Sequence, residues 1–516
     1  MRRSLLFKVV VGLLFAVCAA SAVRADVKLP GVFADHMVLQ RDMALPVWGW
    51  AEPGEKVTVT LGEQTKTATA DGCGKWQVKL DAMPAGGPHV LSVKGNNALK
   101  IDDVLVGEVW IGSGQSNMAM SVAGSANFEA EKAAANHPKI RMFTVSRKTA
   151  EEPQTDCTGQ WNVCSPDTVG RFSATAYFFG RELHKALDVP VGMINSSWGG
   201  TPVQAWTSLP AQEALPQLKP MLDSWKKRIA EYDPEKAKQQ YEKQLAVWKD
   251  RAAKAKAAGK RPPRRPRGPY DPVNNPHRPA SLYNGMIAPL VPYALRGGIW
   301  YQGESNAGGS SAKLYGLQLQ AMITNWRNDW AQGDFPFLWV QLPNFRGLQQ
   351  QPVETSGWVI VQEEMLKSLS LPGSGMAVTI DIGEAADIHP KNKQDVGRRL
   401  AQWALATTYG KDMVACGPLY KSMQKQGDKI TITFDHVGSG LVAKGGEGLK
   451  GFAVAGADRK FVWADAKIKG DKVVVSSSQV KDPVAVRYAW AMNPIANLYN
   501  KAGLPASPFR TDDWQE

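Results

Sequence analysis

The middle of the chain alternates short, wholly apolar runs with polar, glycine-rich turns. Such runs are typical of strands buried on both faces of a parallel sheet. They occupy residues 104–111, 189–194, 297–301, 337–341 and 376–380. Segments with helical patterns, at residues 174–187 and about 395–409, lie between and after these runs. This order predicts an α/β domain over residues 104–410, with polar turns at the carboxyl ends of its strands.

The two flanks of this middle part have the alternating pattern of half-buried strands. The runs at residues 46–50, 56–61 and 76–80 come before it, and those at 429–434, 472–475 and 484–488 come after it. Glycine and proline turns separate them. We therefore predict an N-terminal β domain (26–103) and a C-terminal β region (411–516), both β-sandwich-like. The N-terminal domain is either a carbohydrate-binding module or a structural support, and we favour support.

The first 25 residues have the pattern of a signal peptide. A basic start is followed by an apolar core at residues 9–20 and a small-residue cleavage site at 23–25. We expect cleavage after Ala25 and an exported protein, periplasmic or secreted. No later apolar run approaches the roughly 20 residues of a membrane span, so none is predicted.

The formal charge of +13 is concentrated in one segment. Residues 223–267 hold 15 Lys/Arg and 6 Asp/Glu, and without this segment and the signal peptide the chain is neutral. The basicity therefore does not indicate a nucleic-acid-binding protein. We predict a helical insertion at about 221–268 that returns through a Pro-Arg stretch. A solvated insertion is favoured over an arm that touches an acidic polysaccharide, and the oligomeric state stays open.

Four cysteines remain after the signal peptide: Cys73, Cys157, Cys164 and Cys416. In an oxidising compartment Cys157 and Cys164 are close enough in sequence for a small disulfide. The alternative, that all four are free and buried, is equally open. The chain has neither a CxxC pair nor an HExxH motif, so zinc lacks its usual ligands and no metal or cofactor is expected.

The strongest chemical signal follows the first buried strand, where residues 112–118 are Gly-Ser-Gly-Gln-Ser-Asn-Met. Glycines permit a sharp turn, and a strand–turn–helix sequence presents Ser116 at the carboxyl edge of a sheet, as a nucleophile requires. The alternative is that Ser116 is an ordinary helix N-cap.

Three more strand ends have polar groups of complementary chemistry. They are Gly199 and Gly200, Gln302 with Glu304, and Asp387 with His389. Serine needs a histidine to accept its proton, the histidine needs an acid, and the oxyanion needs N–H donors. Together the four strand ends predict a serine hydrolase site.

These blocks resemble the sialate O-acetylesterase family of the SGNH (GDSL-like) hydrolases. The matching stretches are GQSNM (114–118), NSSWGGTP (195–202), IWYQGESNA (299–307) and DIHPKNKQDVGRRLA (387–401), and both ends of the mature chain also match. The resemblance implies a flavodoxin-like parallel sheet with helices on both faces. It also implies hydrolysis of sugar acetyl esters, with Ser116 as nucleophile and His389 as base.

The resemblance further implies an oxyanion hole from the Ser116 amide, Gly199 or Gly200, and the Gln302 side chain. Asp387 is our choice as the triad acid, with Glu304 second.

For the acetylated carbohydrate substrate we expect contacts from Gln115, Asn117, Trp198 and Asn306, with Trp206 and Trp300 as further tryptophans suited to a sugar ring. The alternatives are an acetyl-xylan or other polysaccharide acetylesterase, a lipase or thioesterase, and a non-catalytic, exported carbohydrate-binding protein.

Overall fold

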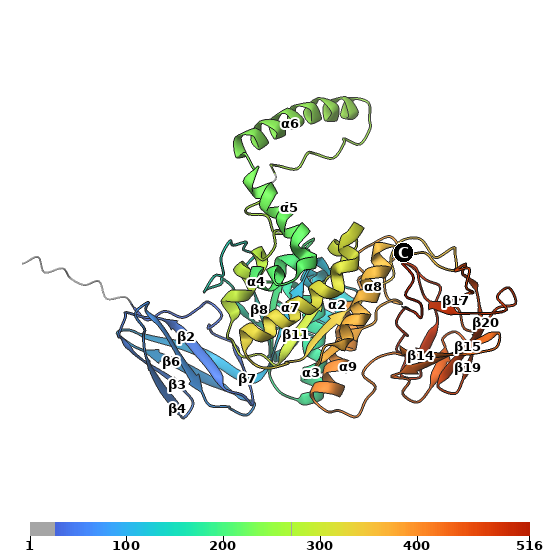
Figure 1. Cartoon of the computed structure of the whole chain (residues 1–516). Helices are drawn as coiled ribbons and strands as arrows, with labels where there is room; N and C mark the ends of the chain where they lie inside the picture. The colour runs from blue at the N-terminus through green and yellow to red at the C-terminus, as the bar shows by residue number, and fades with distance from the viewer. Residues whose placement is uncertain (1–25, 270, 516) are drawn as a thin grey trace, which may run out of the picture.

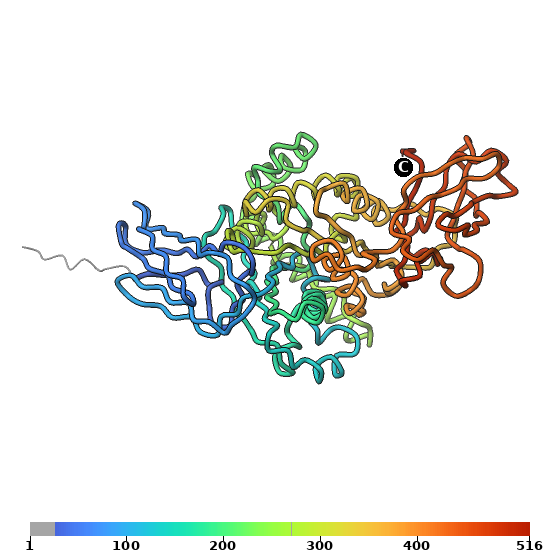
Figure 2. The backbone as a smooth tube through the Cα atoms, turned by 90° about the horizontal axis from the view of Figure 1, so that it is seen from below, coloured from blue at the N-terminus to red at the C-terminus, as the bar shows by residue number. Residues whose placement is uncertain are grey.

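The molecule has three parts in a row. The computed structural model describes residues 26–269 and 271–515, so the predicted signal peptide lies outside the described residues. N-terminal β sheets, a central α/β part and C-terminal β sheets follow one another, and both views place the two β parts at opposite ends of the α/β part (Figures 1 and 2).

Six parallel strands form the centre of the large sheet. They are β7 (Ala98–Gly114), β8 (His137–Thr144), β10 (Val191–Ser197), β11 (Gly297–Tyr301), β12 (Phe337–Val340) and β13 (Ser374–Ala377). Their order is β8-β10-β7-β11-β12-β13, and β9 (Trp161–Cys164) adds an antiparallel edge. The predicted parallel sheet is confirmed. The five predicted strands lie in the order β10-β7-β11-β12-β13, so the second lies beside the first, as in the flavodoxin-like order. Strand β8, which the sequence patterns did not predict, extends the sheet beyond β10.

Helices pack against both faces of this sheet. Helices α3 (Ala174–Leu187) and α9 (Lys393–Trp403) share one hydrophobic core with Trp110 of β7. Helices α7 (Tyr315–Trp330) and α8 (Gly357–Lys367) share another with its neighbours Val109 and Ile111. Successive side chains of a strand point to opposite faces of the sheet. Residues 109–111 of β7 are all apolar because helices cover both faces.

The N-terminal part consists of two sheets. One contains β1 (Val38–Gln40), β3 (Lys56–Leu61), β4 (Gln64–Thr69), β6 (Gly86–Lys94) and the first half of β7, and the other pairs β2 (Leu45–Trp50) with β5 (Lys75–Leu80). Since β7 belongs both to this part and to the central sheet, the predicted boundary between residues 103 and 104 falls inside a continuous strand.

A buried carboxylate on β7 ties the N-terminal part to the α/β part. Glu108 accepts hydrogen bonds from Arg41 (2.6 Å), Arg296 (2.8 Å) and the Tyr409 hydroxyl (2.8 Å), and its side chain is fully buried. Burial alone raises the pKa of Glu108, but these bonds and the charges of the two arginines more than offset it and lower that pKa.

The C-terminal part contains two four-stranded antiparallel sheets that share one core. The first has the order β14 (Leu419–Gln426), β15 (Lys429–Asp435), β20 (Lys472–Ser476), β19 (Asp465–Lys469), and the second β18 (Val462–Trp463), β17 (Phe452–Ala455), β21 (Ala485–Tyr488), β23 (Phe509–Arg510). A further pair joins β16 (Leu441–Ala443) to β22 (Leu498–Asn500).

The basic insertion forms two helices that project from the α/β part, α5 (Lys219–Ala230) and α6 (Pro234–Ala257) (Figure 1). No residue of α6 is buried, as expected of a solvated insertion. The Trp248 indole donates to the Pro263 carbonyl (2.8 Å), which holds the Pro-Arg return against the helix.

The four described cysteines are free thiols, so the Cys157–Cys164 disulfide is not formed. The alternative is also partly wrong, because Cys73 is exposed while the other three are buried. Burial raises the pKa of the Cys157 thiol to about 12 and that of Cys164 to about 11. None of the helices in the described ranges is long and apolar enough to cross a membrane.

Candidate active site

Three adjacent strands end at the same level. Gly114, the last residue of β7, pairs with Ser197 of β10 on one side and with Tyr301 of β11 on the other. The polar segments that follow these strands therefore meet at one edge of the sheet, as predicted for parallel strands.

Gly114 makes the turn that presents Ser116. Its φ is +133°, and a Cβ at this position would lie 2.2 Å from the Tyr301 carbonyl oxygen, so only glycine fits. The helix α1 (Ser116–Ala119) starts directly afterwards. Its N-cap is Gln115 rather than Ser116, so the alternative in which Ser116 merely caps a helix is wrong.

The loop after β13 brings His389 to this serine. The strands β11 and β12 separate β13 from β7, so the loop reaches back across the sheet edge. His389 Nε2 lies 2.8 Å from Ser116 Oγ, within hydrogen-bond distance.

Asp387 lies behind the same imidazole. Its Oδ1 is 3.6 Å from His389 Nδ1 and accepts the His389 backbone N–H at 2.9 Å. Both side chains are 42% exposed, so solvent reaches this pair.

Glu304 occupies a different place, at the start of the 3-10 turn Glu304–Asn306. Its Oε1 accepts from Asn117 Nδ2 (2.5 Å), and its Oε2 is buried with no hydrogen-bond partner among the described residues. Burial raises the pKa of Glu304. No hydrogen bond or ion pair joins Glu304 to His389 among the described residues, so this carboxylate does not orient the imidazole by direct bonding.

The backbone of Gly199 lies beside Ser116. Gly199 packs so close that a Cβ on it would be 3.3 Å from Ser116 Cβ, whereas Gly200 faces open space. Within the described residues neither the Ser116 nor the Gly199 N–H has an acceptor. These two groups are therefore free to bind an oxyanion.

The Gln302 side chain is not free in this way. It is fully buried, and its Nε2 donates to Gln115 Oε1 (3.1 Å), Thr201 O (3.2 Å) and Asn306 Oδ1 (2.8 Å). The predicted role as a direct oxyanion donor is wrong for this geometry because both amide hydrogens are used inside the protein.

The predicted substrate contacts divide into two groups. Asn306 is 1% exposed and bonded on all sides, and the amide of Asn117 is used by internal partners, so neither is available to a sugar. Gln115 keeps its Nε2 without a partner among the described residues, since its Oε1 accepts from Gln302 and from the Ser305 N–H. Trp198 is half-buried, with Arg147 5.7 Å above its ring.

Two further tryptophans named from the sequence do not face the site. Trp206 and Trp300 are completely buried and pack edge-to-face on each other, with ring centroids 6.1 Å apart. They belong to the core.

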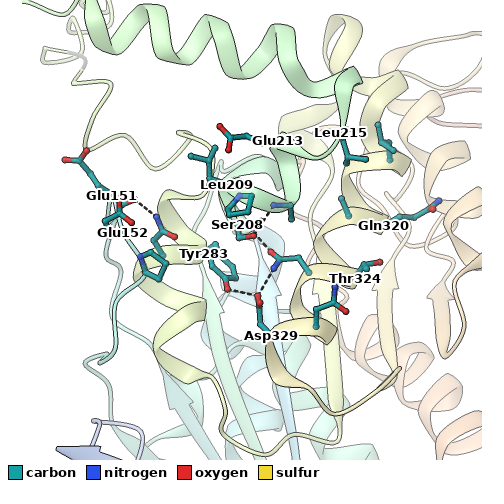
Figure 3. A pocket seen from close by; sticks show the side chains of 18 of the residues that line it. Glu151, Glu152, Ser208, Leu209, Glu213, Leu215, Tyr283, Gln320, Thr324 and Asp329 are labelled. Carbon is teal, nitrogen blue, oxygen red and sulfur yellow. Dashed lines mark hydrogen bonds between the residues drawn. The ribbon is translucent and has the colours of Figure 1, made fainter. Parts of the chain in front are cut away.

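A separate cavity of about 860 Å³ lies between α4 (Leu209–Glu213) and α7. Tyr283 donates to Asp329 there at 2.6 Å (Figure 3). Ser116, Gly199 and His389 do not line it, so it is distinct from the site at the sheet edge.

Lys393 is the site-adjacent residue that the sequence patterns missed. It is completely buried, and its Nζ donates to Asn117 Oδ1 (2.6 Å) and to the Pro390 carbonyl (2.7 Å). Burial lowers the pKa of Lys393 to about 7, although the charges of Glu304, Glu384 and Asp387 act to raise it. A lysine at the start of a helix gives no signal of burial in a single sequence.

No group of three or more His, Cys, Asp or Glu side chains within residues 26–269 and 271–515 is placed to hold a metal ion. A serine and a histidine in contact, beside free backbone N–H groups at the edge of an α/β sheet, define the class of serine esterases and related acyl hydrolases.

The comparisons with known proteins specify the family. The model of the carbohydrate esterase family "sialic acid-specific acetylesterase" matches residues 106–238 and 274–406. The chain belongs to this family and is an esterase. The gap between the two matched segments contains most of α6 and the Pro-Arg return.

Individual relatives match almost the whole chain. The sialate O-acetylesterases of Rattus norvegicus and Homo sapiens are both 30% identical to it; each alignment covers 92% of this chain and, respectively, 92% and 90% of the relative. The crystal structure of a carbohydrate acetylesterase from Xanthomonas citri is 40% identical, covers 95% of this chain and 100% of that one, and has a TM-score of 0.79.

Proposed function

We propose that this protein removes O-acetyl groups from sugars through an acetyl-enzyme formed on Ser116. The 2.8 Å contact between His389 Nε2 and Ser116 Oγ is the observation that supports this most directly. It pairs a nucleophile with a base at the sheet edge, and membership of the carbohydrate esterase family supplies the ester.

In the first half of the reaction, Ser116 Oγ attacks the acetyl carbonyl carbon while His389 Nε2 accepts the hydroxyl proton. The oxyanion accepts hydrogen bonds from the Ser116 and Gly199 N–H groups. His389 then gives the proton to the sugar oxygen as the C–O bond breaks. Asp387, 3.6 Å from Nδ1, stabilises the imidazolium in between.

In the second half, a water molecule attacks the acetyl group on Ser116, and His389 accepts one of its protons. When the tetrahedral intermediate collapses, the proton returns to Ser116 Oγ and acetate leaves. Each cycle therefore consumes one ester and one water, and it regenerates the free hydroxyl.

In this mechanism Gln302 acts through Gln115. By donating to Gln115 Oε1, together with the Ser305 N–H (3.2 Å), it fixes which end of the Gln115 amide is the oxygen and leaves Nε2 as the free end. That N–H group and Trp198 are the side chains we assign to substrate contact.

Two substrate classes remain as candidates. The sialate O-acetylesterases named above favour acetylated sialic acid. Acetyl-xylan or another acetylated polysaccharide is the second candidate, because the 40% identical relative from Xanthomonas citri is named a carbohydrate acetylesterase and not a sialate esterase. We keep the predicted export as part of this proposal, on the signal-peptide pattern of the first 25 residues.

A substrate panel tests the proposal. Acetate release is measured from acetylated sialic acid, acetyl-xylan and acetylated pectin, with Ser116→Ala as the blank. Release from one or more of these sugars, absent in the variant, is expected. If no acetate is released from any of these sugars while long-chain acyl esters are hydrolysed, the protein is a lipase or thioesterase and the proposal is wrong.

A further inference from the structure

The residue that follows Ser116 is held by a buried lysine and a buried carboxylate on opposite sides. Asn117 is completely buried, and its Oδ1 accepts from Lys393 Nζ at 2.6 Å. Its Nδ2 donates to Glu304 Oε1 at 2.5 Å and to the Ile388 carbonyl at 3.0 Å. The Asn117 amide thus has partners from two separate segments.

Both segments matter to the geometry between Ser116 and His389. Ile388 directly precedes His389, and Lys393 Nζ also donates to the carbonyl of Pro390, the residue directly after it (2.7 Å). The backbone on either side of His389 is therefore held by Asn117 and Lys393, and Asn117 is itself adjacent to Ser116.

Lys393 also determines which way the Asn117 amide points. An amide presents one accepting and one donating end, and Lys393 Nζ donates to the accepting oxygen. With Lys393 on the oxygen, the NH₂ end must face Glu304 and Ile388. The Lys393 ammonium lies 5.0 Å from the centre of the Tyr301 ring, which confines it from another side.

We propose that Lys393 is a positioning residue for this esterase, and that with Asn117 and Glu304 it holds the His389 loop at hydrogen-bond distance from Ser116. Glu304 then acts on the reaction through Asn117 rather than by touching the imidazole. This inference rests on the roles proposed above for Ser116 and His389.

Two substitutions of similar size separate the donor function of Lys393 from simple packing. Lys393→Met keeps the volume but leaves Asn117 Oδ1 and the Pro390 carbonyl without their donor. Lys393→Gln is also neutral but retains an N–H donor. A displacement of about 1 Å between reacting groups costs about 10²-fold in rate, so we expect Lys393→Met to lower kcat about 10²-fold. Lys393→Gln should retain more of the activity.

KM distinguishes positioning from a damaged binding surface. Because Lys393 is buried and does not face substrate, KM for p-nitrophenyl acetate should stay within about two-fold while kcat falls. The matched control is Lys391→Met, since Lys391 is an exposed lysine of the same loop. Its kcat should equal that of the parent enzyme.

A double substitution tests the link to Asn117. If the two residues act as one unit, Asn117→Ala combined with Lys393→Met costs no more than the more damaging single change. Losses that multiply would overturn the proposed unit, as would a folded Lys393→Met enzyme with parental kcat.

If Lys393→Met does not fold, the test rests on Asn117→Ala alone. A folded Asn117→Ala enzyme with lowered kcat supports the proposal, and one with parental kcat overturns it. An active Ser116→Ala enzyme would instead remove the proposed function itself, so the two failures are distinguishable.

Discussion

Asp387 offers the most informative single substitution in the proposed site. Asn at this position keeps an oxygen that can accept the His389 backbone N–H at 2.9 Å, so the loop conformation is retained. It removes the negative charge that lies 3.6 Å from His389 Nδ1. That charge stabilises the imidazolium which forms during acyl transfer.

The magnitude follows from the distance and the exposure. Two unit charges 3.6 Å apart attract by about 1 kcal/mol in water and by about 4.6 kcal/mol at an effective dielectric constant of about 20. Both side chains are 42% exposed, and exposed pairs lie near the lower bound. A loss of about 1–2 kcal/mol in the transition state corresponds to a fall in kcat of about 5- to 30-fold.

The assay is steady-state hydrolysis of p-nitrophenyl acetate by Asp387→Asn beside a melting curve. KM should change less than about two-fold, because no substrate contact is removed. Asp412→Asn is the control, since Asp412 is an exposed carboxylate outside this loop, and its kcat should be unchanged. A folded Asp387→Asn enzyme with parental kcat would refute the role of Asp387. A loss of about 10⁴, as in a buried serine-protease triad, would refute the solvent-exposed geometry.

Three further outcomes are expected. Ser116→Ala should lower kcat at least about 10³-fold with an unchanged melting temperature; appreciable turnover in the folded variant would disprove the nucleophile. Dialysis against EDTA should leave esterase activity intact, and activity restored only by a divalent ion would show that the proposed metal-free mechanism is wrong. Glu108→Gln should lower the free energy of unfolding at pH 7 by about 3 kcal/mol, because Arg41 and Arg296 lose a buried partner. Since the folded-state pKa of Glu108 is lowered, its contribution to the free energy of unfolding is complete above the ordinary value of 4.5 and disappears as pH falls through the lowered pKa. Urea titrations at several pH values check this. A difference in the free energy of unfolding between parent and variant that does not shrink in acid would contradict it.

The sequence patterns predicted the bounds of individual helices and strands more accurately than the complete set of strands in the sheet. Helix α3 and strand β11 have the predicted bounds, because a single period of apolar residues defines each of them. Strand β8 beside β10 was not predicted, because its residues 137–144 do not form a wholly apolar run.

The same distinction applies to the site. The contact between Ser116 and His389 was anticipated because both residues follow predicted strands or their loops. The use of Gln302, Asn306 and Asn117 as internal bridges was not, because a polar residue in a motif has the same sequence signature whether it faces substrate or another buried amide. Lys393 escaped notice for the related reason that a lysine is rarely buried.

The 17-residue strand β7 has a consequence for how this protein can be divided. A protein shortened to begin at residue 104 would lack the first six residues of β7 together with β1 and β6, and residues 104–107 would expose an unpaired edge to other chains. A one-residue slip in that pairing would turn every side chain of the strand to the opposite face and would displace the turn at Gly114 relative to the ends of β10 and β11. The N-terminal strands β1 and β6 therefore add to β10 and β11 in fixing the register of the strand that leads to the nucleophile. An exchange of this module for another during evolution requires a replacement that continues the same strand in the same register.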